Sequence, residues 1–166
     1  MSSVTDVSPP ATRPRFDAVS DRLLLTPGQR RCFSRWFYAA AAYNLVWGVA
    51  VILFPRAGFE LAGVALPVPP DLTLQLWQCI GMFVMVFAIG YWCAARDPER
   101  YAPFILIGTL GKVFGPIGFA WGWWQGKMPG AVGWTIVFND LIWWPVFFAF
   151  VWKVMLRPAL RPTARL

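Results

Sequence analysis

Four long apolar segments constrain what this chain can fold into more than any other feature of its 166 residues. They cover residues 36–54, 74–95, 102–124 and 131–152. A helix of about 20 residues, rising 1.5 Å per residue, crosses a hydrocarbon core of about 30 Å. Because lipid offers no hydrogen-bond partners to an exposed backbone, each segment is predicted to be a helix. None shows the alternating polarity that a membrane strand requires.

The connections between these segments predict an up-down arrangement. The second and third connections, residues 96–101 and 125–130, are short, so consecutive helices should be antiparallel neighbours. The first connection, residues 55–73, is longer, and its apolar side chains predict a short piece lying in the membrane interface. The expected fold is therefore all-α, a four-transmembrane-helix up-down bundle over residues 36–156.

The two ends of the chain are predicted to lie outside the bundle. Residues 1–35 are expected to form a disordered, basic cytoplasmic tail, with residues 16–25 as a short amphipathic helix that Pro27-Gly28 interrupts. Residues 157–166 are expected to form a second basic cytoplasmic tail.

The distribution of basic residues predicts the orientation in the membrane. Of the fifteen Lys and Arg residues, twelve lie before the first segment, between the second and third, or after the fourth. The two other connections hold only Arg56 and Lys127, and Lys112 lies within a segment. The positive-inside rule then places both termini in the cytoplasm, and we expect a multi-pass protein of a bacterial inner membrane. The net charge of +7 is interpreted as this topology signal, and nucleic acid is not expected as a partner.

The absence of histidine restricts the chemistry further. It excludes His-ligated haem, HExxH zinc hydrolases and Ser-His-Asp triads, which all need an imidazole. No cofactor and no metal site are expected.

Lys112 and Asp140 are the charged residues that lie deep within the predicted helices. Lys112 is roughly 15 Å from the cytoplasmic end of the third segment and Asp140 roughly 14 Å from the outer end of the fourth, at 1.5 Å per residue. These levels differ by about one helical turn. An unpaired charge at the centre of a membrane helix costs about 2.5–3.5 kcal/mol on insertion scales. We therefore predict an ion pair between Lys112 and Asp140.

Further polar and aromatic groups are expected to join this pair in a ligand-binding site. The amides come from three of the segments, with Gln78 expected to act as a lid, and two deep indoles follow Asp140 by three and four positions. The additional candidates are Tyr43, Asn44, Gln78, Asn139, Trp143 and Trp144. Each amide alone is also consistent with an ordinary interhelical hydrogen bond, worth about 0.6 kcal/mol on average.

Glycines line one face of the third segment, at positions 111, 115, 118 and 122. This small-xxx-small spacing predicts close approach of a neighbouring helix along that face.

The combination of these motifs resembles a group of small bacterial four-helix integral membrane proteins without an assigned activity. The resemblance covers roughly residues 36–152. It includes Tyr43-Asn44 with Trp47-Gly48, Trp77-Gln78-Cys79 with Gly81, Gly111-Lys112 with Gly115-Pro116-Ile117-Gly118, and Asn139-Asp140 with Trp143-Trp144. A looser similarity, to DoxX-like proteins, rests on the number of helices alone. The resemblance implies a membrane location and a shared polar site, and it implies no reaction.

Three functions remain open at this point. The first is a site at the bilayer midplane that binds or passes a small ligand or a proton, in a homo-oligomer because four helices form a thin barrier. The second is an accessory subunit of a larger membrane complex, with a purely structural ion pair. The third is a membrane enzyme using Lys112 and Asp140 as an acid/base pair, although no further catalytic constellation supports it.

Overall fold

The computed structural model describes residues 24–61, 63–66 and 70–160. Three continuous helices, α1 (Pro27–Leu53), α3 (Asp71–Arg96) and α4 (Ala102–Trp124), are long and apolar enough to cross a membrane, and so is the interrupted helical segment Gly130–Ala159. A short helix, α2 (Pro55–Leu61), follows α1. The described residues contain no strand, so the all-α prediction is confirmed for them.

The fourth span is not the continuous helix that the sequence predicted. Short α-helical, 3-10 and π-helical pieces follow one another along it: η2 (Gly130–Val132), α5 (Gly133–Asn139), η3 (Leu141–Trp143), α6 (Trp144–Val151), η4 (Trp152–Leu156) and α7 (Arg157–Ala159). The interruption between α5 and η3 falls at Asp140, inside the predicted span.

The first helix begins nine residues earlier than predicted, so residues 27–35 belong to α1 rather than to a tail. Thr26 caps this helix: its hydroxyl accepts from the Gln29 amide at 3.3 Å, and the Gln29 side chain accepts from the Thr26 amide at 3.1 Å. Pro27 occupies the first turn, where its missing N–H costs nothing. Pro27-Gly28 therefore forms the first turn of α1. The amphipathic helix expected at residues 16–25 falls almost entirely outside the described residues.

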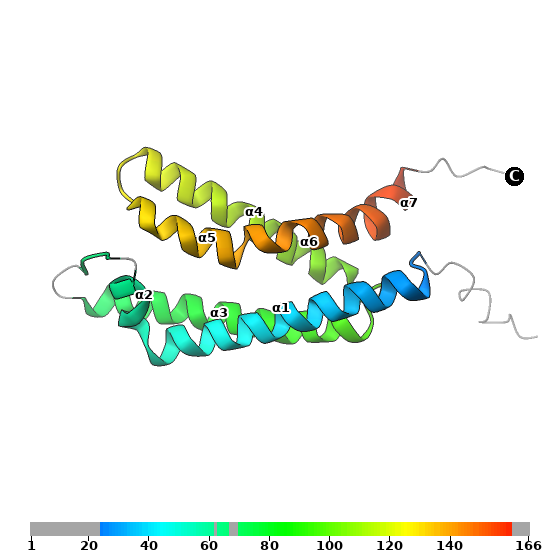
Figure 1. The fold of residues 1–166 in the computed structure, drawn as a ribbon, viewed down its shortest axis with the longest axis horizontal. Coiled ribbons are helices and arrows are strands. Elements are labelled where there is room, and N and C mark those ends of the chain that lie inside the picture. The colour runs from blue at the N-terminus through cyan, green and yellow to red at the C-terminus, as the bar shows by residue number, and fades with distance from the viewer. Residues whose placement is uncertain (1–23, 62, 67–69, 161–166) are drawn as a thin grey trace, which may run out of the picture.

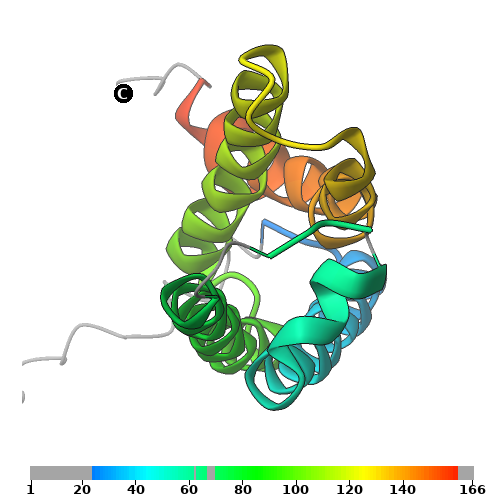
Figure 2. The ribbon, with the colours of Figure 1, turned by 90° about the vertical axis from the view of Figure 1, so that its left-hand side faces the viewer.

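The helices form two hairpins that lie side by side, α1 with α3 and α4 with the fourth span (Figure 1). Successive spans run in opposite directions. The start of α1, the α3–α4 turn and α7 lie at one end of the molecule, which we call the arginine-rich end, while α2 lies at the opposite end. Figure 2, a view from that opposite end, shows α1 and α3 together on one side and the second hairpin on the other.

Glycines allow close packing within and between the hairpins. A Cβ at Gly48 would lie 2.7 Å from the carbonyl oxygen of Gly81, so α1 and α3 nearly touch through their backbones. Between α3 and α4, Gly90 accommodates the ring of Phe104, and Gly108 accommodates Tyr91.

A hydrophobic core cluster joins the hairpins in the half of the bundle nearer the arginine-rich end. Its most deeply buried rings are Phe37, Tyr91, Phe147 and Phe150, which come from α1, α3 and α6. Before Asp140 in the chain, α5 packs mainly on α4. After Asp140, α6 contacts both α4 and α1. The core thus ends at about the level of the interruption.

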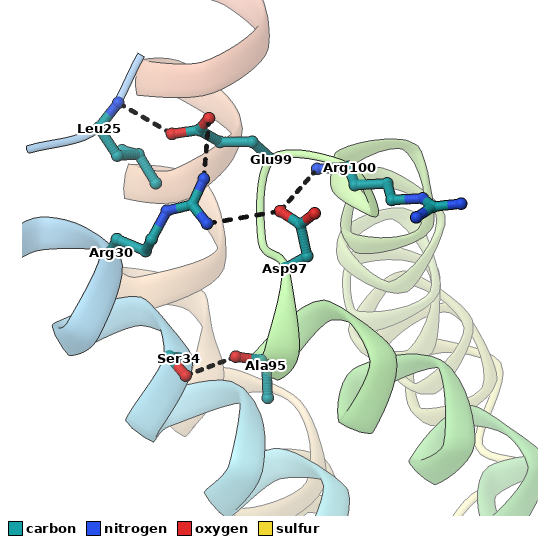
Figure 3. Close-up of polar contacts among 7 residues, drawn as sticks. All are labelled: Leu25, Arg30, Ser34, Ala95, Asp97, Glu99 and Arg100. Atoms are coloured by element: carbon teal, nitrogen blue, oxygen red, sulfur yellow. Dashed lines mark hydrogen bonds and ion pairs between the residues drawn. The ribbon is translucent and has the colours of Figure 1, made fainter. Parts of the chain in front are cut away.

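Polar contacts fasten the arginine-rich end (Figure 3). Arg30 reaches from α1 to Glu99 at 3.2 Å and to Asp97 at 3.7 Å, and the Leu25 amide donates to Glu99 at 3.1 Å. The Ser34 hydroxyl donates to the carbonyl of Ala95 at the end of α3. The start of α1 is thereby tied to the α3–α4 turn.

Candidate functional site

Lys112 and Asp140 meet between the two helices of the second hairpin. The ammonium nitrogen Nζ lies 3.8 Å from Oδ1 of Asp140, and the two side chains are only 6% and 8% exposed. Lys112 stands near the middle of α4 and Asp140 at the interruption of the fourth span. The predicted ion pair is confirmed.

The interruption at Asp140 supplies the ammonium with its hydrogen-bond acceptor. Pro145 lacks an N–H and its ring crowds the carbonyl one turn earlier, which disfavours regular α-helix just before it. There the Trp143 amide donates to the carbonyl of Asp140 at 3.1 Å, instead of to that of Asn139 as in an α-helix. The carbonyl of Asn139 accepts from Lys112 Nζ at 2.6 Å.

A proline also leaves a backbone carbonyl without its helical donor on the facing helix. In an α-helix the carbonyl of Lys112 would accept from the amide of residue 116, but this residue is Pro116. The indole Nε1 of Trp144 donates to the Lys112 carbonyl at 3.0 Å. Each helix therefore has a backbone carbonyl without its usual helical donor, and a side chain of the other helix donates a hydrogen bond to it.

Gly115 allows the Asp140 carboxylate to approach α4. A Cβ at this position would lie only 2.5 Å from Oδ2 of Asp140. The glycine face predicted for this helix does not act as one continuous contact, because a Cβ at Gly111 or Gly118 would meet no atom within 4 Å. Close approach is confined to particular glycines.

Aromatic rings surround the ammonium. The ring centroids of Trp143 and Phe147 lie 5.8 Å and 5.9 Å from Nζ, distances at which the ring quadrupole attracts a cation. Tyr43 joins indirectly, since its ring packs on Trp143 with 5.4 Å between centroids. We call Lys112, Asn139, Asp140, Trp143 and Trp144 the central site.

The other two predicted amides make their contacts elsewhere. Asn44 is buried, and its Nδ2 donates a long 3.5 Å bond to the carbonyl of Val84 in α3. Gln78 donates to the carbonyl of Ile52 at 2.8 Å and so joins α3 to α1. Both side chains donate hydrogen bonds within the first hairpin, and the role of Gln78 as a lid over the Lys–Asp pair stays a prediction.

The central site leaves hydrogen-bonding capacity unused. Among the described residues, Lys112 makes one hydrogen bond with its three N–H groups, because 3.8 Å to Asp140 is too long for another. Asn139 Nδ2 donates to Asp140 Oδ1 at 3.3 Å, while Asn139 Oδ1 and Trp143 Nε1 are buried without a partner. Buried polar atoms normally have hydrogen-bond partners, so these unused donors and acceptors are suited to bind water or a polar ligand.

Two contributors to this site, Phe147 and Pro145, were missed from the sequence. Phe147 looked like ordinary apolar filling, and nothing in its spacing marks it. Pro145, by contrast, gave a readable signal for an interruption just upstream. Gly115 lies three residues after Lys112, so the sequence predicts that it leaves space beside the ammonium, and the structure shows that the Asp140 carboxylate approaches α4 at this glycine.

Among the described residues, no group of three or more His, Cys, Asp or Glu side chains is placed to hold a metal ion. Searches of family models, curated proteins and solved structures find no match to this chain.

Proposed function

We propose that this chain is a small multi-pass protein of a bacterial inner membrane whose central site binds a small polar ligand or passes a proton. Both termini face the cytoplasm in this proposal. The arginines at the start of α1, in the α3–α4 turn and in α7 support that orientation through the positive-inside rule.

One observation carries the functional part of the proposal. A buried Lys–Asp pair retains unused donors and acceptors: N–H groups of Lys112, Nε1 of Trp143 and Oδ1 of Asn139. A pair that served only to hold two helices together would gain from satisfying these groups, because an unpaired buried polar atom costs about 1–3 kcal/mol. A bound water or ligand with both donors and acceptors removes that cost.

A structural role, as in an accessory subunit, is the second candidate. The reciprocal bonds Lys112–Asn139 and Trp144–Lys112 favour it, because they lock α4 to the fourth span without any ligand. The third candidate, a membrane enzyme, gains no support from the described residues beyond the pair itself.

The experiment compares the wild type with K112L/D140M in liposomes and in mild detergent. Proton flux is followed with a pH-sensitive dye under a potassium diffusion potential, and co-purifying small molecules are identified by native mass spectrometry. N44L is the matched control, since it removes a buried amide outside the central site.

We expect the wild type and N44L to share a proton flux or a bound molecule that K112L/D140M lacks. If all three proteins fold and behave alike in both measurements, the functional proposal is refuted and the structural role stands.

A further inference from the structure

A basic groove lies on the exposed face of α1 near its start, at the arginine-rich end of the molecule. Its volume is about 560 Å³, and it is lined by Gly28, Arg31, Cys32, Arg35 and Trp36. These positions recur every three to four residues, so they share one face of the helix, and all five residues are exposed. No acidic side chain among the described residues lines this groove, which therefore presents two positive charges without a negative one.

The two arginines of the groove are available to an anion. Within the described part of the chain, neither Arg31 nor Arg35 makes an ion pair. The neighbouring Arg30, by contrast, is paired with both acidic side chains of the α3–α4 turn (Figure 3). Because Arg31 and Arg35 are one helical turn apart, their guanidinium groups can reach the same phosphate, each with two N–H groups.

The end of the groove toward the middle of α1 is apolar. The ring of Trp36 packs edge-on against the buried ring of Trp143, with 6.4 Å between centroids, so this wall is held in position. Beyond Trp36 the same face continues with Ala39 and Ala42, which are both exposed and small. A hydrocarbon chain can lie along these alanines, because no long side chain projects from them. An indole between basic residues and an apolar surface is typical of the membrane interface.

The charge and the apolar surface together select the ligand. A free phosphate would use the two arginines and leave the alanines without a function. A zwitterionic lipid would bring a cation close to the arginines, whereas a head group with a net negative charge is attracted by both. A molecule that carries a phosphate and an alkyl chain, and no cation, matches both parts of the groove.

We propose that this groove binds an anionic glycerophospholipid. The phosphate lies between Arg31 and Arg35, and one acyl chain runs past Trp36 along Ala39 and Ala42. The proposal goes beyond the proposed function, because none of the groove residues belongs to the central site. It holds whether or not Lys112 and Asp140 bind a ligand.

The test measures lipid binding to the full-length protein in mild detergent by native mass spectrometry. Phosphatidylglycerol and phosphatidylcholine with identical acyl chains are titrated separately, and inorganic phosphate is added as a competitor. R31Q/R35Q removes the arginines of the groove. R96Q/R100Q is the matched control, because it removes the same charge from two exposed arginines at the same end of the molecule, outside the groove.

A second pair of variants tests the apolar part without changing any charge. A39W places a ring across the surface on which the acyl chain lies. A120W is its control, since it places the same side chain at an exposed alanine of α4. Both pairs alter exposed positions, and circular dichroism shows whether each variant keeps its helices.

We expect phosphatidylglycerol to bind the wild type more tightly than phosphatidylcholine. R31Q/R35Q should lower the affinity for phosphatidylglycerol about 30-fold, at about fivefold for each arginine near a head group, and R96Q/R100Q should change it little. A39W should also weaken binding, and A120W should not.

Three results would overturn the proposal. Equal losses in R31Q/R35Q and R96Q/R100Q would show that only the overall charge matters. Equal affinities for the two lipids, or equal effects of A39W and A120W, would rule out an anionic lipid seated in the groove. Displacement of phosphatidylglycerol by inorganic phosphate would assign the arginines to free phosphate instead.

Discussion

Replacing Gly115 with alanine tests how the central site is built. The new Cβ would lie 2.5 Å from Oδ2 and 3.3 Å from Cγ of Asp140, about an ångström short of ordinary van der Waals contact with the oxygen. The carboxylate cannot move far, because it is buried beside Lys112 and Asn139. Overpacking of this kind costs about 1–3 kcal/mol.

Gly111 provides the reference one turn away on the same helix. A Cβ there meets nothing within 4 Å, so G111A should gain the helix propensity of alanine, roughly 0.5–1 kcal/mol, without any clash. G115A gains the same propensity, so the difference between the two variants isolates the clash. We expect G115A to be less stable than G111A by about 1–3 kcal/mol, or about 5- to 150-fold in the unfolding equilibrium.

The assay is reversible unfolding by dodecyl sulfate in mixed micelles, followed by far-ultraviolet circular dichroism. The same pair of substitutions is then measured in the K112L/D140A background, where no carboxylate remains to clash and the difference should vanish. Equal stability of G115A and G111A in the wild-type background would refute the close approach of Asp140 to α4.

Three further predictions use the same unfolding assay. Trp144→Phe removes the donor to the Lys112 carbonyl and should destabilise the protein by about 1–3 kcal/mol. The loss should be smaller in a Pro116→Ala background, because there a backbone amide can bond that carbonyl. An equal loss in both backgrounds would contradict this hydrogen bond. Lys112→Met leaves the Asp140 carboxylate buried without its ion-pair partner and should lower the free energy of unfolding by about 3–5 kcal/mol. Adding Asp140→Asn should recover most of this loss. No recovery would show that the ion pair is not the source of the loss. Arg30→Ala removes ion pairs that are partly exposed and should cost less than about 1 kcal/mol, with a smaller effect at high salt; a larger, salt-independent loss would mean that Arg30 acts through packing.

The sequence was sufficient for features that depend on length and apolarity. The bounds of α4 match the predicted residues 102–124, because Asp97-Pro98 and Pro129-Gly130 leave little freedom on either side. The earlier start of α1 was also readable, since Thr26 and Gln29 form a capping box. The basic composition of residues 27–35 favours a tail, but the local capping box at Thr26 outweighs it and starts the helix.

The depth of the site residues along their helices was predictable, but the rotation of each helix about its axis was not. Lys112 and Asp140 could be paired because their levels follow from helix rise, and a buried charge requires a partner. Asn44 and Gln78 lie in α1 and α3, and their amide nitrogens donate to carbonyls of the first hairpin, while Oδ1 of Asn44 is buried without a partner among the described residues. Which carbonyl an amide meets depends on helix rotation and crossing, and these in turn depend on contacts such as Gly48–Gly81.

The most direct test of the central site measures the distance between Lys112 and Asp140 in a lipid bilayer. Solid-state NMR of protein labelled with ¹⁵N at lysine Nζ and ¹³C at the aspartate carboxyl suits this chain, because it contains only three lysines, at positions 112, 127 and 153. We expect a dipolar coupling from Lys112 to Asp140 that matches an Nζ–Oδ1 separation of 3.8 Å and is absent in D140N labelled in the same way. A Lys112 signal without coupling to any carboxyl carbon would contradict the central site and the proposals that depend on it.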